Sequence, residues 1–490
     1  MKLVGKVALG AVAIVAVLVT VVLVRTFTYH PATAVDVTAV KLAEAPAIDQ
    51  ARAAKRLGQA IRFKTISHQD AAENDLAEWD RLHAWLASTY PAAHAAMTRE
   101  IIGGKTLFYT WQGSDPALRP IVLMAHQDVV PVTAGTEGDW KHPPFDGIIA
   151  EDAVWGRGSI DDKGSLVAIF EGVEALVASG FKPRRTVIIV SGHDEEVGGT
   201  GAQAAAALMK SRGLKAEFVL DEGMAVVADN PVTGSPAAVI GVAEKGYATL
   251  KVVARAPGGH SSAPPAETGV QVLASAITAI TGSPFLLKFD GPGADMVRGL
   301  APQGSFLTRM AVANQWLFGP LLKKQMASTP AGAATLHTTI APTMLKGSPK
   351  ENVLPQDATA WINYRIAPGQ THEDVMARAQ AAVKGLDVEL SWERTPNNPS
   401  PVSSTSSESW RLLSALASEG GSIPVVPGLV TAGTDSRYLV PVADNVYRFQ
   451  PIRASMREFT MIHGTNEHMT LPNLARMTVF YARLIASAAG

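Results

Sequence analysis

The chain has 490 residues, no cysteine and a formal net charge of −1. Because single hydrophobic cores stop growing well below this length, we expect at least two domains. The balanced charge, without a long run of lysine or arginine, argues against nucleic acid as a partner. The absence of cysteine excludes disulfides, thiol nucleophiles and thiolate ligands, so histidine and carboxylate side chains must bind any metal.

The N-terminal segment, residues 1–34, differs from the rest of the chain. An uncharged apolar run at 7–24 follows Lys2 and Lys6 and ends at Arg25. About 18 residues at a rise of ~1.5 Å nearly cross a hydrocarbon core, which favours a membrane anchor over a signal peptide. The alternative is cleavage, since ATA at 32–34 has the form of a cleavage site. The preceding lysines predict a folded part outside the cytoplasm, periplasmic or extracellular, or exported after cleavage.

Beyond residue 45, short apolar runs alternate with amphipathic segments, which predicts an α/β fold. Three of the apolar runs, PIVLMA, RTVIIVS and EFVL, end at charged or imidazole side chains. The residues that follow them are, in order, His126 and Asp128; His193, Asp194, Glu195 and Glu196; and Asp221 and Glu222. Open α/β sheets bind ligands beyond the carboxyl ends of their strands, so these three groups should meet at one edge.

A fourth group of acids, Asp161 and Asp162, lies in the glycine-rich turn WGRGSIDDKGS. A single acid after a strand is often only a helix N-cap. Carboxylates from four loops would repel one another at one edge unless a cation were bound there. Imidazole and carboxylate without sulfur suit zinc or a similar divalent metal. We expect a further ligand from MIHGTNEH near the C-terminus, where His463 and His468 precede a final amphipathic helix.

Taken together, these motifs resemble the zinc-dependent peptidases and amidohydrolases that include carboxypeptidase S, aminoacylase and glutamate carboxypeptidase. The motifs, in chain order, are MAHQDVVPV, GRGSIDDKGS, GHDEEVGG, VLDEG, GGHSSAPP, ENVLP with NYRIAPG, GTDSRY and IHGTNEH. The spelling of the first three is most similar to the carboxypeptidase S branch, which includes enzymes that act on N-acyl amino acids. The resemblance implies a mixed, largely parallel sheet flanked by helices, with an inserted α+β lid of ferredoxin-like type.

This resemblance also implies the division of the chain. Residues 45–240 and 396–490 would form the two parts of a catalytic zinc-binding domain, and 241–395 the inserted lid, through which relatives often dimerise. The lid segment shows strand, helix, strand and helix patterns of its own. Its piece at 285–335 is longer than a minimal lid requires, and we interpret it as a helical insertion that covers the lid or contacts a membrane or partner.

The resemblance implies two Zn²⁺ ions per chain, or other divalent metals, bridged by Asp161. The implied ligands are His126 and Asp221 for one ion and Glu196 and His463 for the other, with Glu222 as the alternative to Asp221. Glu195, beside a ligand, would be the general base. Asp128 would hold the His126 ring through its second nitrogen. This role would explain why the carboxylate lies two positions after the imidazole.

Residues of the lid and the C-terminal part are implied to contact substrate. His260, in PGGHSSAP, would donate to the developing oxyanion from the same or a neighbouring subunit, unless it only caps its turn. Arg365 resembles the family residue that binds a free carboxylate, or is an ordinary surface arginine. The further implied contacts to that carboxylate are Asn352, Gly433, Thr434 and Ser436.

The predicted function is that of a metal-dependent hydrolase that cleaves an amide next to a free carboxylate. The substrate would be a small peptide cut at its C-terminal residue or an N-acyl amino acid. The chain would be held at the membrane by its N-terminal helix and could form a homodimer. An aminopeptidase, which needs a pocket for a free amine, and a non-catalytic binding protein on the same fold are the alternatives.

Overall fold

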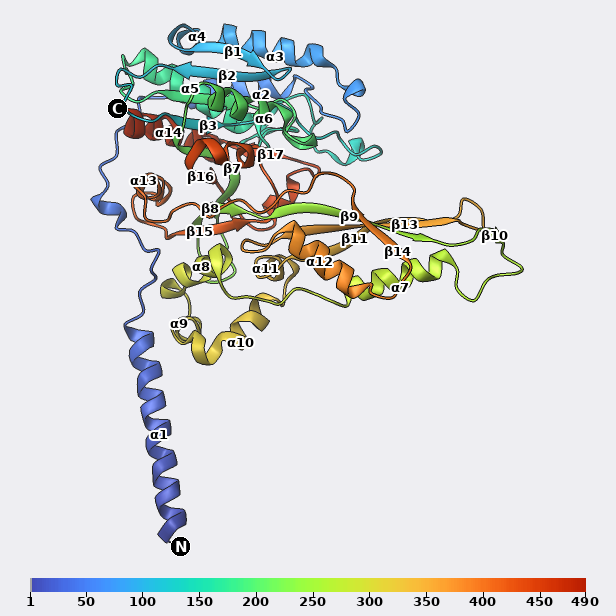
Figure 1. Cartoon of the computed structure of the whole chain (residues 1–490). Coiled ribbons are helices and arrows are strands. Elements are labelled where there is room, and N and C mark those ends of the chain that lie inside the picture. The colour runs from blue at the N-terminus through green and yellow to red at the C-terminus, as the bar shows by residue number, and fades with distance from the viewer. Residues whose placement is uncertain (1) are drawn as a thin grey trace.

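The computed structural model describes residues 2–490 and shows an N-terminal helix, a large α/β domain and an elongated lid (Figure 1). Met1, the first residue of the predicted segment 1–34, lies outside the described residues. Helix α1 (Lys2–Phe27) projects from the folded part. Among the described helices, it alone is long and apolar enough to cross a membrane.

The large domain is built on a mixed sheet of eight strands. In spatial order the strands are β1 (Thr98–Ile102), β2 (Thr106–Trp111), β6 (Val187–Ser191), β3 (Ile121–Met124), β7 (Ala216–Val227), β16 (Ala443–Ala454), β8 (Ala237–Glu244) and β15 (Val425–Val430). Strand β3 is parallel to both β6 and β7, β7 is parallel to β16, and β8 is parallel to β15. The predicted mixed, largely parallel sheet is therefore confirmed.

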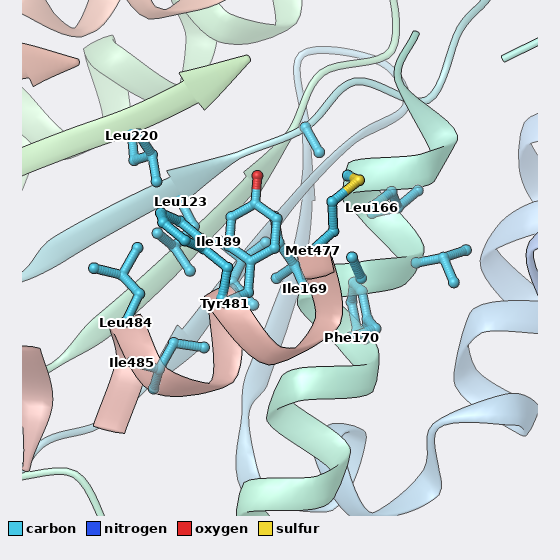
Figure 2. Packing of buried hydrophobic residues seen from close by; sticks show 14 of the residues in the cluster. Leu123, Leu166, Ile169, Phe170, Ile189, Leu220, Met477, Tyr481, Leu484 and Ile485 are labelled. Carbon is cyan, nitrogen blue, oxygen red and sulfur yellow. The ribbon is translucent and has the colours of Figure 1, made fainter. Parts of the chain in front are cut away.

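Both faces of this sheet are covered because its central strands are apolar on both sides. In β3, Ile121 and Leu123 contact one layer, whereas Val122 and Met124 contact the other. The first layer comprises α2 (Gln50–Ile61), α3 (Leu76–Thr89), α4 (Pro91–Ala96), α5 (Lys163–Ala178), α13 (Glu408–Ala417) and α14 (Leu471–Ala489). The second comprises α6 (Thr200–Ser211) and the 3₁₀ helix Asp435–Val442. Figure 2 shows side chains of α5 and α14 packed against Leu123, Ile189 and Leu220 of the sheet.

A small antiparallel sheet ties the C-terminal part of the domain to the glycine-rich turn. It contains β4 (Ile148–Ala150), β5 (Ala153–Trp155) and β17 (His468–Thr470), with β5 in the middle. Strand β5 leads directly into the turn that carries Asp161, and β17 follows the loop that carries His463. Two motifs about 300 residues apart in the sequence are thus brought side by side.

The lid is a four-stranded antiparallel sheet with helices on one face. Its elements are β9 (Gly246–Arg255), α7 (Gly269–Thr281), β11 (Thr339–Lys346), β13 (Asp357–Ile366), α12 (His372–Ala382) and β14 (Val388–Trp392), with strand order β11-β13-β9-β14. This is the ferredoxin-like arrangement that the resemblance implies. The strand and helix patterns of the sequence did not identify β11, because it is an exposed edge strand that contains Pro342.

The piece at 285–335 is helical, and it lies between the lid and α1. It contains α8 (Gly291–Leu300), α9 (Phe306–Ala313), α10 (Gln315–Met326) and α11 (Pro330–Ala334). At the opposite end of the lid, a two-stranded ribbon of β10 (Gly259–His260) and β12 (Val353–Leu354) forms the tip (Figure 1). The lid therefore has one end at the catalytic domain and one far from it.

Candidate metal centre

Histidine and carboxylate side chains from four loops meet at the carboxyl edge of the large sheet. Because β6, β3 and β7 are neighbouring parallel strands, their ends deliver His126, the turn with Glu195 and Glu196, and Glu222 to the same place. The turn before α5 adds Asp161. The convergence expected from the sequence therefore appears in the structure.

Asp161 lies between two histidines and offers one oxygen to each. Its Oδ1 is 2.8 Å from His126 Nε2, and its Oδ2 is 3.0 Å from His463 Nε2. His463 also lies 3.1 Å from the Glu196 carboxylate. A carboxylate between two imidazoles is suited to bridging two metal ions.

His468, the second histidine of the C-terminal motif, lies outside this cluster. Its ring stacks on Trp155, with 4.2 Å between the ring centroids, and its Nδ1 is 2.8 Å from the backbone oxygen of Asn466. The structure thus brings His463 to the cluster and gives His468 a packing role.

The adjacent acids Asp221 and Glu222 have different surroundings in the structure. Glu222 Oε1 lies 3.4 Å from His126 Nε2, and His126, Asp162 and Glu222 form a group with metal-binding geometry. Asp221 instead accepts hydrogen bonds from the backbone N–H groups of Glu222 and Ser436, at 3.0 and 2.9 Å. Successive side chains on a strand point to opposite sides, so only one of the two acids can face His126. The geometry favours Glu222, the alternative of the two acids, and the choice of ligand between Asp221 and Glu222 stays a prediction.

Asp128 orients the His126 ring and the turn that carries the two glutamates. His126 Nδ1 is 2.9 Å from the backbone oxygen of Asp128 and 3.3 Å from its carboxylate. That carboxylate is fully buried, and it accepts hydrogen bonds from Ser67 Oγ and from the backbone N–H groups of Glu195 and Glu196. One side chain therefore fixes a ligand tautomer and aligns the Glu195 backbone.

Glu467, within the IHGTNEH motif, fixes the turn that carries Asp161. Its buried carboxylate pairs with Arg157 at 2.8 Å and accepts hydrogen bonds from the backbone N–H groups of Gly158, Ile160 and Asp161. The sequence did not lead us to assign it a role, although Glu467 is the one acid of that motif, which was an available signal.

The cluster holds more carboxylates than its histidines can neutralise. Burial, together with the charges of Asp161 and Asp162, raises the pKa of Glu222 well above its ordinary value. Hydrogen bonds with Asp161 and Glu196 raise the pKa of His463 to about 10. Such a site is short of positive charge, and its oxygen and imidazole donors fit divalent metals. The residues present therefore fit the predicted metal-dependent chemistry.

The carboxyl group of Glu195 lies beside the cluster but, unlike the backbone N–H of this residue, is not part of the hydrogen-bonded network. Burial, followed by the charges of Asp435, Glu222 and Glu196, raises the pKa of its carboxyl well above the usual range, although His126 opposes the shift. Within residues 2–490 no hydrogen bond holds this carboxyl group. It is therefore free to exchange a proton with a group bound at the cluster.

Three cations, which we call the cationic group, gather where the lid meets the catalytic domain: Lys245, Arg365 and Arg437. Burial and then Arg365 lower the pKa of Lys245 to about 8, and burial and Arg437 both lower the pKa of Arg365. The Lys245 ammonium donates to the backbone oxygens of Ala334 and His337. Arg365 lies over the Tyr247 ring at 4.7 Å, and no carboxylate of the described chain pairs with it.

The loop Gly433–Ser436 supports this region differently from the expectation. The hydroxyls of Thr434 and Ser436 are buried, lie 2.6 Å apart, and both point to Glu244, which pairs with the buried Arg448. Gly433 leaves room for Arg437, because a Cβ there would lie 2.4 Å from its Nη1. In this structure these residues position charged groups instead of presenting free donors to a substrate.

His260 and Asn352 lie together at the tip of the lid, away from the cluster. The backbone N–H of Ser261 donates to the backbone oxygen of Asn352. His260 is exposed, and its ring is hydrogen-bonded to the Ser262 hydroxyl. Arg365 is at the other end of β13, about 26 Å from the strand's start at a rise of ~3.3 Å per residue. Within one chain, Asn352 is therefore not a partner of Arg365, and His260 does not reach the metal-binding edge.

The chain is similar to known proteins over most of its length. A model described as "Peptidase family M20/M25/M40" matches residues 122–487. The chain is 36% identical over 434 residues to N-fatty-acyl-amino acid synthase/hydrolase PM20D1 of Xenopus tropicalis, covering 87% of this chain and 84% of that protein. It is 30% identical over 485 residues to Carboxypeptidase S of Saccharomyces cerevisiae, covering 88% and 83%.

Among solved structures, the M20 family metallo-carboxypeptidase Sso-CP2 from Sulfolobus solfataricus matches with a TM-score of 0.65. The match covers 89% of this chain and 99% of that chain at 16% sequence identity, and it shows a common fold. The resemblance drawn from the eight motifs is confirmed by these similarities.

Proposed function

Because the chain belongs to peptidase family M20/M25/M40, we propose that it cleaves amides whose amine half is an amino acid with a free carboxylate. It is a metal-dependent amide hydrolase, and its relatives include a carboxypeptidase and N-fatty-acyl-amino acid hydrolases. Substrates of this kind are N-acyl amino acids and peptides cut at the C-terminal residue. The cationic group carries the proposal, because Arg365 is a half-buried cation without an anionic partner in the described chain.

Arg437 links the carboxylate end of such a substrate to the reacting end. Burial lowers its pKa, but Tyr438 and then the charges of Glu195 and Glu244 raise it, so it lies near these two acids. Its own charge lowers the pKa of Arg365. A carboxylate bound at Arg365 would therefore place the neighbouring amide toward Glu195. An aminopeptidase would need an acidic pocket for a free amine, and the cationic group has the opposite charge.

We assign two Zn²⁺ ions to the cluster, with Asp161 between them. His126 and Glu222 would complete one site, and Glu196 and His463 the other. When bound, the ions would polarise the amide carbonyl and lower the pKa of a water molecule between them. Asp128 keeps the His126 ring in the tautomer that leaves Nε2 free to ligate.

Glu195 acts as the proton carrier in this proposal. Its carboxylate accepts a proton from the attacking water, and the same carboxyl then donates it to the leaving amine nitrogen. The raised pKa of Glu195, caused first by burial, strengthens the carboxylate as a base for the first transfer. The Asp128 contacts to the Glu195 backbone hold this residue at the cluster's edge.

His260 enters the proposal only through a second copy of the chain. Because the lid tip is distant from the chain's own cluster, His260 can donate to an oxyanion only in the partner of a homodimer. Asn352, which adjoins His260 at the tip, would enter the same neighbouring site.

We also propose that α1 is retained as an anchor, with the catalytic part outside the cytoplasm. Cleavage after ATA at 32–34 would remove contacts that α1 and Tyr29 make with the folded part. Asn314 donates to the backbone oxygen of Val22, Arg25 donates to that of Ala313, and Tyr29 donates to that of Arg298. A segment destined for removal has no need of such contacts.

The substrate class is tested on the full chain in nanodiscs, with bound metal measured by elemental analysis. The panel contains N-acyl amino acids of increasing acyl length, dipeptides, the carboxamide of each, and amino acid anilides. We expect two zinc ions per chain and cleavage only where the carboxylate is free. Equal hydrolysis of acids and carboxamides would remove the role of Arg365, and cleavage of the anilides would favour an aminopeptidase.

A further inference from the structure

The end of α1 is built into the folded part by the insert at 285–335. Thr26 is fully buried and Val22 is only 8% exposed, although most of α1 is bare. Asn314, itself buried, donates to the Val22 oxygen at 3.2 Å and to Thr26 Oγ1 at 3.3 Å. The Arg25 side chain donates to the Ala313 oxygen. Helix α1 is therefore docked on α9 and α10, and its height relative to them is fixed.

Next to this junction, α9 and α10 expose an apolar surface, which we call the insert patch. Its residues, between 41% and 67% exposed, are Phe306, Leu307, Trp316, Leu317 and Leu321. On α10 they recur at the spacing of one helical face, and Phe306 packs against Phe27 of α1 with 5.9 Å between ring centroids. The patch is continuous with the anchor.

The length of α1 sets the depth of the patch. The apolar helix Lys6–Phe27 has 22 residues and a mean hydropathy of 3.1. At ~1.5 Å per residue it spans about 33 Å, so a hydrocarbon core about 30 Å thick ends near its last turn. That turn is the one that packs on α9, and α9 and α10 are the part of the folded chain nearest the bare length of α1 (Figure 1).

We propose that α9 and α10 form a platform whose insert patch is seated in the surface of the bilayer that α1 crosses. An exposed Trp316 beside leucines, with Lys323 and Lys324 in the last turn of α10, is the composition of an interfacial helix. This inference assigns a partner to the insert and does not depend on the substrate. It does require that α1 is retained in the membrane.

The absence of cysteine allows single spin labels to be placed without altering other residues. Labels at Leu307→Cys and Leu317→Cys, in the full chain in phosphatidylcholine–phosphatidylglycerol nanodiscs, are tested for collision with oxygen and with a water-soluble nickel complex. Ile101→Cys on β1 is the matched control, because Ile101 is apolar and 50% exposed but far from α1. Val15→Cys, in the middle of α1, reports on the anchor itself.

We expect the oxygen-to-nickel collision ratio at 307 and 317 to exceed that at 101 several-fold, and to be smaller than that at 15. A high oxygen-to-nickel collision ratio at 15 with a low ratio at 307 and 317 would overturn the platform and leave the anchor. Exclusion of both reagents at 307 and 317 would also overturn it, in favour of a second copy or another protein as the cover. A low oxygen-to-nickel collision ratio at 15 would overturn the anchor and the platform together.

Discussion

The carboxylates around Asp161 and the cationic group around Arg365 are both charged and partly or fully buried, but their charges are compensated in different ways. In the metal-binding cluster, Asp161 is held between two histidines, whereas burial and then the charge of Asp161 raise the pKa values of Glu222 and Glu196. In the cationic group, Lys245 is satisfied by backbone oxygens, whereas Arg365 has only the face of Tyr247.

This difference indicates that the acidic cluster binds its ligand permanently, whereas the cationic group binds one transiently. A group of buried carboxylates is stable only with a permanently bound cation. Without it, each carboxylate would have to be protonated or would be repelled by its neighbours. A half-exposed arginine remains hydrated while it waits for an anion, so it can bind and release a substrate carboxylate at each turnover. The first region should therefore respond to substitution through metal content and the rate of chemistry, and the second through substrate affinity.

The largest expected effect on rate comes from Glu195→Gln. The variant removes the proton carrier but none of the groups assigned to the metals, so kcat should fall by about 10²–10⁴-fold with metal content unchanged. Steady-state kinetics and elemental analysis measure the two quantities. Glu137→Gln, at an exposed acid that is not among the groups assigned to the metals, is the control and should leave both unchanged. Near-normal turnover in the Glu195→Gln variant would remove Glu195 from the mechanism.

A comparison of Glu222→Gln with Asp221→Asn tests which of the two acids ligates. Because Glu222 faces His126 and Asp221 accepts two backbone hydrogen bonds, the first variant should lose about one of two metals and most activity. The second should keep both metals with affinity weakened about 10–100-fold at most, as is typical when a supporting group is lost. Titration with a zinc chelator distinguishes them, and the opposite pattern would restore Asp221 as the ligand.

The proximity of His126, Asp161 and His463 was predictable from the sequence, because these residues follow an apolar strand or belong to recognisable motifs. His126 comes just after β3, the turn with Glu196 follows β6, and parallel neighbours must end at one edge. The choice between Asp221 and Glu222 was not predictable. It depends on which side of β7 faces His126, and a shift of one residue in the register reverses it.

Residues that act through distant partners were the least predictable part of the site. Thr434 and Ser436 point to Glu244, about 190 residues earlier in the chain, and nothing local marks that partner. His260 and Asn352 depend on a ribbon of two residues per strand at the lid tip. Such placements follow from how the lid is attached to the large domain, which local patterns do not encode.

A smaller effect, confined to affinity, is expected for Arg365→Ala. A charge-assisted hydrogen bond to the substrate carboxylate contributes about 1.5–3 kcal/mol, so KM for acids should rise about 10–100-fold with little change in kcat. KM for the matching carboxamides should barely change, which makes the ratio of the two KM values the decisive measurement. Arg365→Lys should lie between, because it keeps the charge and loses the planar fork. Lys251→Ala removes another cation from the same lid strand pair and serves as the control. An unchanged KM for acids in the Arg365→Ala variant would assign the carboxylate to Arg437 instead, which is near enough to both Arg365 and Glu195 for electrostatic interaction.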